Sequence, residues 1–247
     1  MTEFTISLAG WSIRVKALFE STERFCEAYL TREEPQISVC VTEKDIAAEE
    51  EMSAREDMLE GTAPHRYSDA YLETLALYRK ITAALLPHDI LLFHGCVMGY
   101  EGQAYLFTAP SGTGKTTHSR LWLSEIPGCY VLNGDKPLLR FEGDRVLACG
   151  TPWQGKEKMG RNEILPIAAI CVLKRDLVNH IRPITPHDAL PVLIAQSNRP
   201  REAEAMLRTL GLIDRLSKLT KLYELGCNME AEAAHVSFDA MAGGYRV

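Results

Sequence analysis

The eight residues 109–116, which read Ala-Pro-Ser-Gly-Thr-Gly-Lys-Thr, constrain this chain more than any other segment. They have the spacing of a Walker A loop, with alanine in place of the first glycine. An apolar strand is expected just before them, over residues 103–108, and a helix from Lys115 to about Glu125. A strand, a glycine-rich loop and a helix in this order predict a site where backbone N–H groups and the start of the helix surround phosphate.

Each part of this loop has a chemical task. Gly112 and Gly114 let the backbone turn so that successive N–H groups point inward. The Lys115 ammonium is expected to reach the β and γ phosphates, and the Thr116 hydroxyl to bind Mg²⁺. We therefore expect ATP and Mg²⁺ as cofactors, with the nucleotide held by Ala109, Pro110, Ser111, Gly112, Thr113, Gly114, Lys115, Thr116 and Thr117.

A phosphate site of this kind needs a second acid near the metal, and Asp135 is the candidate. It follows a short apolar strand, residues 130–132, so its carboxylate would project from the strand end toward the phosphates. Asn133, Gly134 and Asp135 are also all turn-forming residues, so a simple turn explains the same pattern. The residues alone leave these two interpretations open.

The rest of the chain predicts an α/β or α+β fold in which strands fill the middle and helices lie before and after. We expect two regions: a small N-terminal α+β region with an acidic linker, residues 1–66, and a nucleotide-binding domain, residues 67–247. The acidic segment 44–60 is either a solvated helix or a linker. Further expected strands cover residues 4–8, 13–15, 37–41, 90–98, 138–141, 146–149, 167–173, 180–184 and 221–225, and further helices cover 19–30, 68–86 and 200–218.

Some of these elements carry more detailed predictions. Gly10 between the strands 4–8 and 13–15 favours a hairpin, and the strand 180–184 is expected to pair with 167–173. Ser68 can cap the helix 68–86, and the apolar face of this helix is predicted to contain Tyr71, Leu75, Tyr78, Ile81 and Leu85. The apolar stripe of the helix 200–218 contains Ala203, Met206, Leu207, Leu210, Ile213 and Leu216. Thr185 and Pro186 are typical of a cap and a first-turn proline, and Asn228 is expected to cap a final helix.

Composition narrows the partners. The chain has 46% hydrophobic and 24% charged residues and a net charge of −6, which is ordinary for a globular protein and gives no general attraction to nucleic acid or anionic membranes. The longest apolar stretch, residues 164–173, is half the length that spans a bilayer. Seven cysteines without a Cys-x-x-Cys pair indicate reduced thiols and a cytoplasmic protein.

At this point the chain resembles the HPr kinase/phosphorylase family, which shares its fold with the ATP-dependent phosphoenolpyruvate carboxykinases. The resemblance covers residues 90–195 and rests on His94-Gly95 on a strand, a short hairpin, the glycine-rich loop, and an acid twenty residues after Lys115. It implies a P-loop kinase core rich in antiparallel strands. It also implies ATP-dependent transfer of the γ-phosphoryl group to a serine-type hydroxyl of a peptide, protein or small molecule.

The resemblance further implies roles for single residues. Lys115 contacts the phosphates, Thr116 and Asp135 bind the metal, Asp135 accepts the hydroxyl proton, and His94 belongs to the catalytic set. Members of the family are hexamers, so a homo-oligomer is expected here. A nucleotide-binding regulatory protein with little catalytic activity is the alternative function.

Several positions depart from the family pattern. Gly134 stands where the family has a first acid, next to Asp135. The second metal ligand is Glu157 or Glu163, and Arg182 or His187 would replace a family arginine. The stretch 150–156, Gly-Thr-Pro-Trp-Gln-Gly-Lys, is a second candidate for the site, because Lys156 and Lys158 add charge for phosphate. A proline turn anchored in the core by Trp153 is the other interpretation of that stretch.

Overall fold

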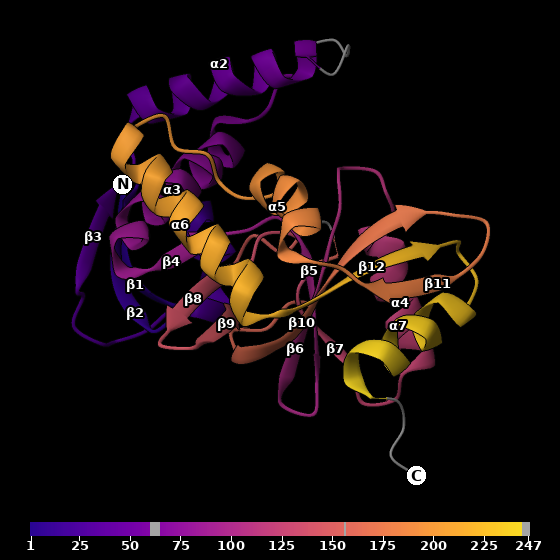
Figure 1. The fold of residues 1–247 in the computed structure, drawn as a ribbon. Helices are drawn as coiled ribbons and strands as arrows, with labels where there is room; N and C mark the ends of the chain where they lie inside the picture. The colour runs from indigo at the N-terminus through magenta and orange to yellow at the C-terminus, as the bar shows by residue number, and fades with distance from the viewer. Residues whose placement is uncertain (60–64, 156, 244–247) are drawn as a thin grey trace. The chain divides into compact units, whose positions relative to one another are not determined.

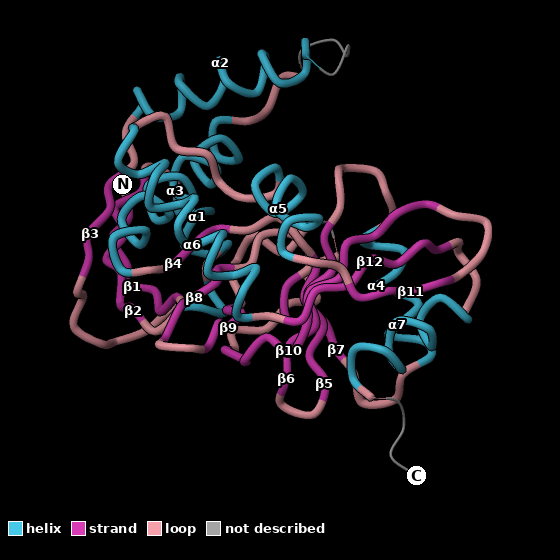
Figure 2. Tube along the Cα trace, in the orientation of Figure 1, coloured by secondary structure: helices cyan, strands magenta, loops and turns pink. Residues whose placement is uncertain are grey.

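The computed structural model describes residues 1–59, 65–155 and 157–243, and the chain folds into two compact units, Met1–Pro87 and His88–Val247. Figure 2 shows that each unit contains both helices and strands. From the sequence we placed the boundary between residues 66 and 67. The structure instead groups the helix α3 (Asp69–Leu85) with the first unit, because α3 packs on α1, α2 and β3 there.

The N-terminal unit contains a three-stranded sheet. Its strands β1 (Thr2–Leu8) and β2 (Trp11–Ala17) form the expected hairpin, and β3 (Ile37–Cys40) adds in parallel to β2. The hairpin turns at Ala9 and Gly10, which both have positive φ, 52° and 81°. Alternate residues of the two hairpin strands face the core, and these are Phe4, Ile6, Leu8, Ile13 and Val15.

Helices complete this unit. The segment expected as one helix over residues 19–30 is a short helix, α1 (Glu20–Phe25), followed by the 3₁₀ turn η1 (Glu27–Tyr29). The acidic segment is a helix, α2 (Glu43–Leu59), so the linker interpretation is wrong for residues 44–59, and residue 60 lies outside the described part. Ser68 caps α3 as expected, but the buried side of α3 differs from the predicted face, since Tyr71 is 47% exposed while Leu72 and Leu77 are buried.

The C-terminal unit is a mixed α/β structure built on one nine-stranded sheet (Figure 1). The strand order is β4-β8-β9-β10-β6-β5-β7, and β12 pairs with β10 and with β11. The bounds are β4 (Ile90–Leu92), β5 (Cys96–Tyr100), β6 (Gln103–Thr108), β7 (Tyr130–Asn133), β8 (Leu138–Glu142), β9 (Arg145–Cys149), β10 (Ile164–Arg175), β11 (His180–Pro183) and β12 (Lys221–Cys227).

The long strand β10 joins the parts of this sheet. Its start pairs with β9 in antiparallel fashion, and its remaining length runs parallel to both β6 and β12. The carboxyl ends of β6, β10 and β12 therefore lie side by side at one edge. In open α/β sheets ligands bind beyond the carboxyl ends of such strands.

Helices α4 (Lys115–Glu125) and α7 (Glu232–Ala242) contact each other and pack on this sheet (Figure 1). Trp122 of α4 and Phe238 of α7 are fully buried, and their rings meet edge to face with centroids 5.6 Å apart. They form one core with sheet residues such as Phe107 and Cys171. The helices α5 (Pro186–Ala195) and α6 (Ala203–Leu219) pack on each other, and α6 also contacts β9 and β12.

Four local predictions need correction. The run 90–98 is two strands, because the amides of residues 93–95 leave the ladder. Those of Phe93 and Gly95 bond the connection between β7 and β8, and that of His94 bonds the Gln196 carbonyl. Strand β11 pairs with β12 and not with β10, since β12 lies between them. On α6, Leu207 is 70% exposed although the periodicity placed it on the buried stripe. Asn228 does not cap α7; its side chain accepts from the Glu230 amide, one turn before the helix begins.

Candidate functional site

The glycine-rich loop connects β6 directly to α4. Gly112 and Gly114 have φ values of 74° and 126°, where any residue with a Cβ is strained. A Cβ at either position would meet no atom within 4 Å, so the backbone conformation requires these glycines and the available space does not. No side chain caps the start of α4, which leaves this helix N-terminus open to an anionic ligand.

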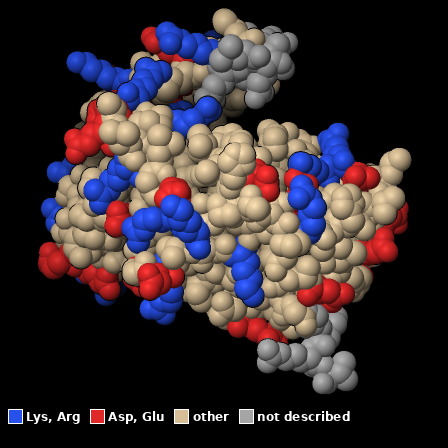
Figure 3. Space-filling view, viewed as in Figure 1, with Lys and Arg blue, Asp and Glu red and all other residues tan. Residues whose placement is uncertain are grey.

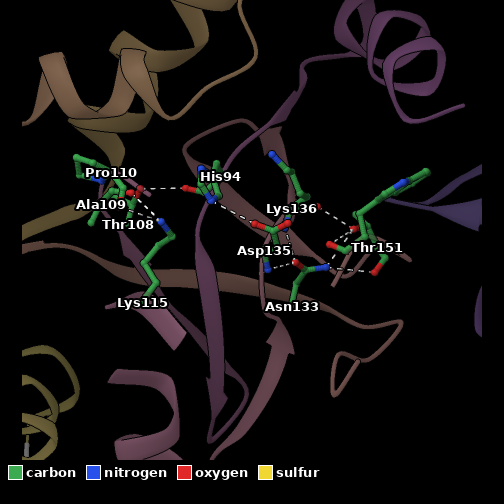
Figure 4. A network of polar contacts seen from close by, with 10 residues as sticks. His94, Thr108, Ala109, Pro110, Lys115, Asn133, Asp135, Lys136 and Thr151 are labelled. Carbon is green, nitrogen blue, oxygen red and sulfur yellow. Dashed lines mark hydrogen bonds and ion pairs between the residues drawn. The ribbon is translucent and has the colours of Figure 1, made fainter. Parts of the chain in front are cut away.

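Lys115 lies across the mouth of this loop. Its ammonium donates to the carbonyl oxygen of Ala109 at 2.8 Å and to that of Pro110 at 3.4 Å (Figure 4). Burial lowers the pKa of the Lys115 ammonium, and the nearby Asp135 carboxylate partly offsets that effect. The ammonium thus sits inside the loop on neutral carbonyl groups, which a charged phosphate oxygen would replace as a stronger partner.

Asp135 lies in a turn and also lines the pocket that contains Lys115. The buried Asn133 side chain accepts hydrogen bonds from the backbone N–H groups of Asp135, at 3.0 Å, and Lys136, at 2.8 Å. The same side chain donates to the Thr151 carbonyl at 3.2 Å and to the Thr151 hydroxyl at 3.0 Å. The two interpretations of Asn-Gly-Asp are therefore compatible, because the turn is what aims the Asp135 carboxylate (Figure 4).

The departure at Gly134 has a steric reason. A Cβ at this position would lie 2.5 Å from the carbonyl oxygen of Gln154. The segment that follows β9 runs against the turn here, and the amide of Lys136 donates to the Trp153 carbonyl at 3.2 Å. Backbone of the 150–155 segment thus occupies the space that a first acid at residue 134 would need.

His94 lies in the connection between β4 and β5, and not on a strand as we expected. Its amide donates to the Gln196 carbonyl at 2.7 Å, and its own carbonyl accepts from the Thr108 hydroxyl at 3.0 Å. These bonds hold the backbone of His94, and Nε2 of its ring lies 3.2 Å from a carboxylate oxygen of Asp135. The following Gly95 is required, because a Cβ there would lie 2.9 Å from the Phe107 carbonyl oxygen of β6.

The electrostatics of Asp135 follow from these contacts. Burial raises the pKa of this carboxyl, but the hydrogen bond from His94 and the charges of Lys136, His94 and Lys115 outweigh it, so the pKa lies below its usual value. Asp135 is accordingly a carboxylate at neutral pH. It can bind a cation or accept a hydrogen bond from a hydroxyl group.

These groups share one pocket of about 580 Å³. Glu157 also lines this pocket, and its carboxylate pairs with Arg120 of α4, whose Nε lies 2.6 Å away. The lining residues are His94, Ser111, Gly112, Gly114, Lys115, Thr116, Thr117, Ser119, Arg120, Val131, Gly134, Asp135, Gln154, Gly155, Glu157 and Met159.

Several expected site residues lie elsewhere. Glu163 accepts from the Tyr130 hydroxyl at 2.6 Å and does not line this pocket, so Glu157 is the closer candidate for a second metal ligand. Arg182 pairs with Glu224 of β12 at 2.7 Å, and His187 lies exposed at the start of α5; neither lines the pocket. Lys156 lies outside the described residues.

The sequence did not indicate the residues that support the site. Asn133 and Thr151 bond each other and hold the Asp135 turn, and Gln154 closes the loop by accepting from the Gly160 amide at 2.7 Å. An Asn-Gly-Asp signature does suggest a side-chain turn, but nothing in the sequence pairs Asn133 with a residue eighteen positions later. For Arg120, the sequence showed only that it lies on the helix after the loop and did not predict its ion pair with Glu157.

Other features of the unit bear on the expected cofactors and partners. Among the residues that the structure describes, no three or more His, Cys, Asp and Glu side chains gather as a metal cage. Mg²⁺ does not need one, since it binds through one or two carboxylates, a hydroxyl, waters and substrate phosphates. Thr116, Asp135 and Glu157 offer such oxygen atoms in the pocket. All seven cysteines are unbridged, as expected.

The expectation that the protein binds neither nucleic acid nor membranes stays a prediction. On the face drawn in Figure 3, basic and acidic side chains of the described residues are interspersed. None of the helices within the described ranges is both long enough and apolar enough to cross a bilayer.

Comparison with known proteins gives a distant likeness to solved structures and no match in sequence. No protein-family model matches this sequence, and no curated protein is similar to it. Among solved structures, the structure of the HPr(Ser) kinase/phosphatase from Coxiella burnetii matches with a TM-score of 0.30 and 12% identity, over 51% of this chain and 97% of that chain. The likeness is to the kind of protein that the motifs resemble, but it is a distant fold relationship and we rest no argument about activity on it.

Proposed function

We propose that the C-terminal unit is an ATP-dependent kinase that transfers the γ-phosphoryl group to a serine-type hydroxyl of a peptide, protein or small molecule. The observation that carries this proposal is that a glycine-rich loop, a loop lysine and an ionised aspartate face one pocket of about 580 Å³. The loop and the start of α4 suit the phosphates, and Lys115 adds a positive charge beside them.

Asp135 has two tasks in this proposal. Its carboxylate orients the acceptor hydroxyl and takes its proton, and the hydrogen bond from His94 fixes the direction in which the carboxylate points. A carboxylate of lowered pKa is a weak base, which is adequate because phosphoryl transfer passes through a loose transition state with little early demand for proton removal. His94 is a positioning residue in this scheme.

The donor set also suits Mg²⁺. Thr116 and Asp135 would hold the ion, with Glu157, which lines the same pocket, as a further oxygen ligand. When bound, such an ion neutralises charge on the phosphate oxygens. Glu157 is already paired with Arg120, so it would have to exchange this partner to reach the metal.

The test is transfer of labelled phosphate from ATP to candidate hydroxyl-bearing peptides and small molecules. Lys115→Ala should abolish nucleotide binding, and Asp135→Asn should keep binding but lower transfer at least a hundredfold. Normal transfer by Asp135→Asn would overturn the assignment of the base. Tight nucleotide binding without transfer to any acceptor would favour the alternative, a nucleotide-binding regulatory protein.

A further inference from the structure

A second pocket lies against the same glycine-rich loop, away from His94 and Asp135. It has a volume of about 460 Å³. Gly112, Thr113 and Gly114 form one wall, and the carboxyl ends of β10 and β12, with the residues that follow them, form the other. The residues contributed by these two segments and by α4 are Thr117, His118, Leu173, Arg175, Asp176, Cys227, Asn228 and Met229.

This pocket continues from the one that holds Lys115 and Asp135. Gly112, Gly114 and Thr117 line both pockets, so a ligand can pass from one to the other over the start of α4. The two pockets lie at the carboxyl ends of neighbouring strands, since β6 leads into the loop and the parallel strands β10 and β12 lead into the far wall. Such a crevice is where open α/β sheets bind extended ligands.

The far wall is held to the loop by direct bonds. Arg175, the last residue of β10, donates through Nη2 to the Gly112 carbonyl at 2.5 Å. The amide of Asp176 donates to the Cys227 carbonyl at 3.0 Å, and the Asn228 side chain donates to the Leu177 carbonyl at 3.1 Å. These bonds preorganise the pocket, which lowers the entropic cost of binding a ligand there.

The chemistry of this wall combines apolar surface with polar edges. Met229 is 77% exposed and Leu173 is buried beneath the pocket, so an aromatic ring can lie on aliphatic and thioether groups. The Asp176 carboxylate is exposed and already accepts from two backbone amides. A flat, partly polar ring is the kind of ligand that suits a mostly apolar pocket with a few polar groups.

His118 adds a buried acceptor. The Ser237 hydroxyl donates to the Ala234 carbonyl at 2.9 Å, so it accepts from Trp122 Nε1 at 2.8 Å and from His118 Nε2 at 3.0 Å. His118 Nδ1 is therefore an unprotonated acceptor, and it is buried without a hydrogen-bond partner among the residues described. His118 is also one of the residues that line the pocket, so its imidazole adds a polar group to this wall.

We propose that this second pocket holds the nucleoside of the phosphoryl donor, with the triphosphate running over Gly112 and Gly114 to Lys115. The proposal rests on the proposed kinase function and adds the place where the base and ribose lie. Thr117 marks the crossing point between the two pockets. Leu173 and Met229 pack on the base, and Arg175 keeps the loop and the far wall together.

A third hollow beside the loop is the rival location. It has about 570 Å³ and is lined by residues 110–113, residues 172–175 and Val192 of α5. It does not include Thr117 or any residue of α4, so a phosphate chain seated on the helix start does not lead into it. The two pockets share Gly112, Thr113, Leu173 and Arg175. Met229 lines only the proposed subsite and Val192 only the third hollow, so substitutions at these two residues compare the pockets directly.

The first test uses the native thiols. Cys227 lines the proposed subsite and is half-buried, whereas the half-buried Cys129 lines none of the three pockets described above. Alkylation rates measured peptide by peptide at about pH 8.5 should fall at least fivefold for Cys227 with Mg-ATP or Mg-ADP, and remain unchanged with tripolyphosphate. Cys129 serves as the internal reference in each sample. Equal Cys227 rates with and without nucleotide, when nucleotide is bound, would overturn the subsite.

The second test uses matched substitutions. Met229→Asp places a carboxylate in the proposed subsite, and Val192→Asp places one in the rival hollow. Affinity for ADP should fall about tenfold in Met229→Asp and stay unchanged in Val192→Asp, while tripolyphosphate affinity stays unchanged in both. The reverse pattern would move the nucleoside to the hollow beside α5. If neither ADP nor tripolyphosphate binds the wild-type protein, the proposed kinase function fails; if both bind but Met229→Asp has no effect, only the subsite fails.

Discussion

Asn133→Ala tests whether a buried side chain, remote from any reacting atom, sets the direction of Asp135. The side-chain amide of Asn133 makes four hydrogen bonds. It accepts two from backbone N–H groups and donates two to Thr151. If each bond contributes about 1 kcal/mol to the free energy of unfolding, their loss in Asn133→Ala lowers it by about 4 kcal/mol. In this variant the Lys136 N–H still donates to the Trp153 carbonyl at 3.2 Å, so the expected loss of unfolding free energy is about 3 kcal/mol.

Urea unfolding measures this loss. The buried Trp122 and Trp153 report on the C-terminal unit once Trp11 of the other unit is replaced by Phe. With a urea m-value of about 3 kcal/mol/M, the midpoint should fall by about 1 M. Transfer measured well below the midpoint should fall by roughly a hundredfold, because a shift of about 1 Å in a catalytic group has that effect. ADP affinity should remain within twofold, since the glycine-rich loop is untouched.

The matched control is Thr151→Val. It removes the hydroxyl that bonds Asn133 and the Lys136 carbonyl, but it leaves both turn hydrogen bonds to Asn133 in place. This variant should lose stability, by about 2 kcal/mol, with transfer reduced less than threefold. If Asn133→Ala loses stability but keeps full transfer, or if Thr151→Val lowers transfer equally, the reasoning that the turn aims Asp135 is refuted.

Three further predictions concern charge, space and capping. The pKa of Asp135 lies below its ordinary value, so its ionised form adds stability above that value and loses it as the pH falls through the lower folded-state pKa. The difference in unfolding free energy between wild type and Asp135→Asn should therefore shrink as the pH falls below about 4. Gly134→Ala should destabilise the C-terminal unit by about 2 kcal/mol, since its Cβ would lie 2.5 Å from the Gln154 carbonyl oxygen. The control Gly211→Ala, on the exposed side of α6, should stabilise the same unit by about 0.5–1 kcal/mol in the same urea assay. Glu73→Ala should destabilise the N-terminal unit by about 3 kcal/mol, because the buried carboxylate accepts from two backbone amides at the start of α1 and from a threonine hydroxyl. Glu73→Gln should lose about half as much stability. Trp11 fluorescence during unfolding measures both losses.

Local signals in the sequence were enough for most elements of the fold. The hairpin at Ala9-Gly10, the Ser68 cap of α3 and the Thr185–Pro186 start of α5 follow from turn and cap chemistry, which acts within a few residues. The helix after Lys115 follows in the same way. Faces of helices were less well predicted: Tyr71 and Leu207 have the spacing of a buried face, but their side chains are 47% and 70% exposed.

Long-range contacts decided the rest. The boundary between the units depends on where α3 packs, and the pairing of β11 depends on β12, which is forty residues away in the chain. The choice of Glu157 over Glu163 was also a matter of tertiary structure, since only Glu157 lines the pocket and Glu163 bonds Tyr130 instead. Spacing in a sequence carries no information about such partners.

For the candidate site, the sequence by itself determined the glycine-rich loop, because φ values that only glycine adopts freely leave a mark at fixed positions next to a lysine and a threonine. It named Asp135 and His94 but not their relation. Only the tertiary structure brought His94 Nε2 within 3.2 Å of the Asp135 carboxylate, placed the Gln154 carbonyl where a first acid would stand, and opened a second pocket behind the loop. The physical reason is that a turn is specified by neighbouring residues, whereas a pocket forms where strands distant in sequence end side by side.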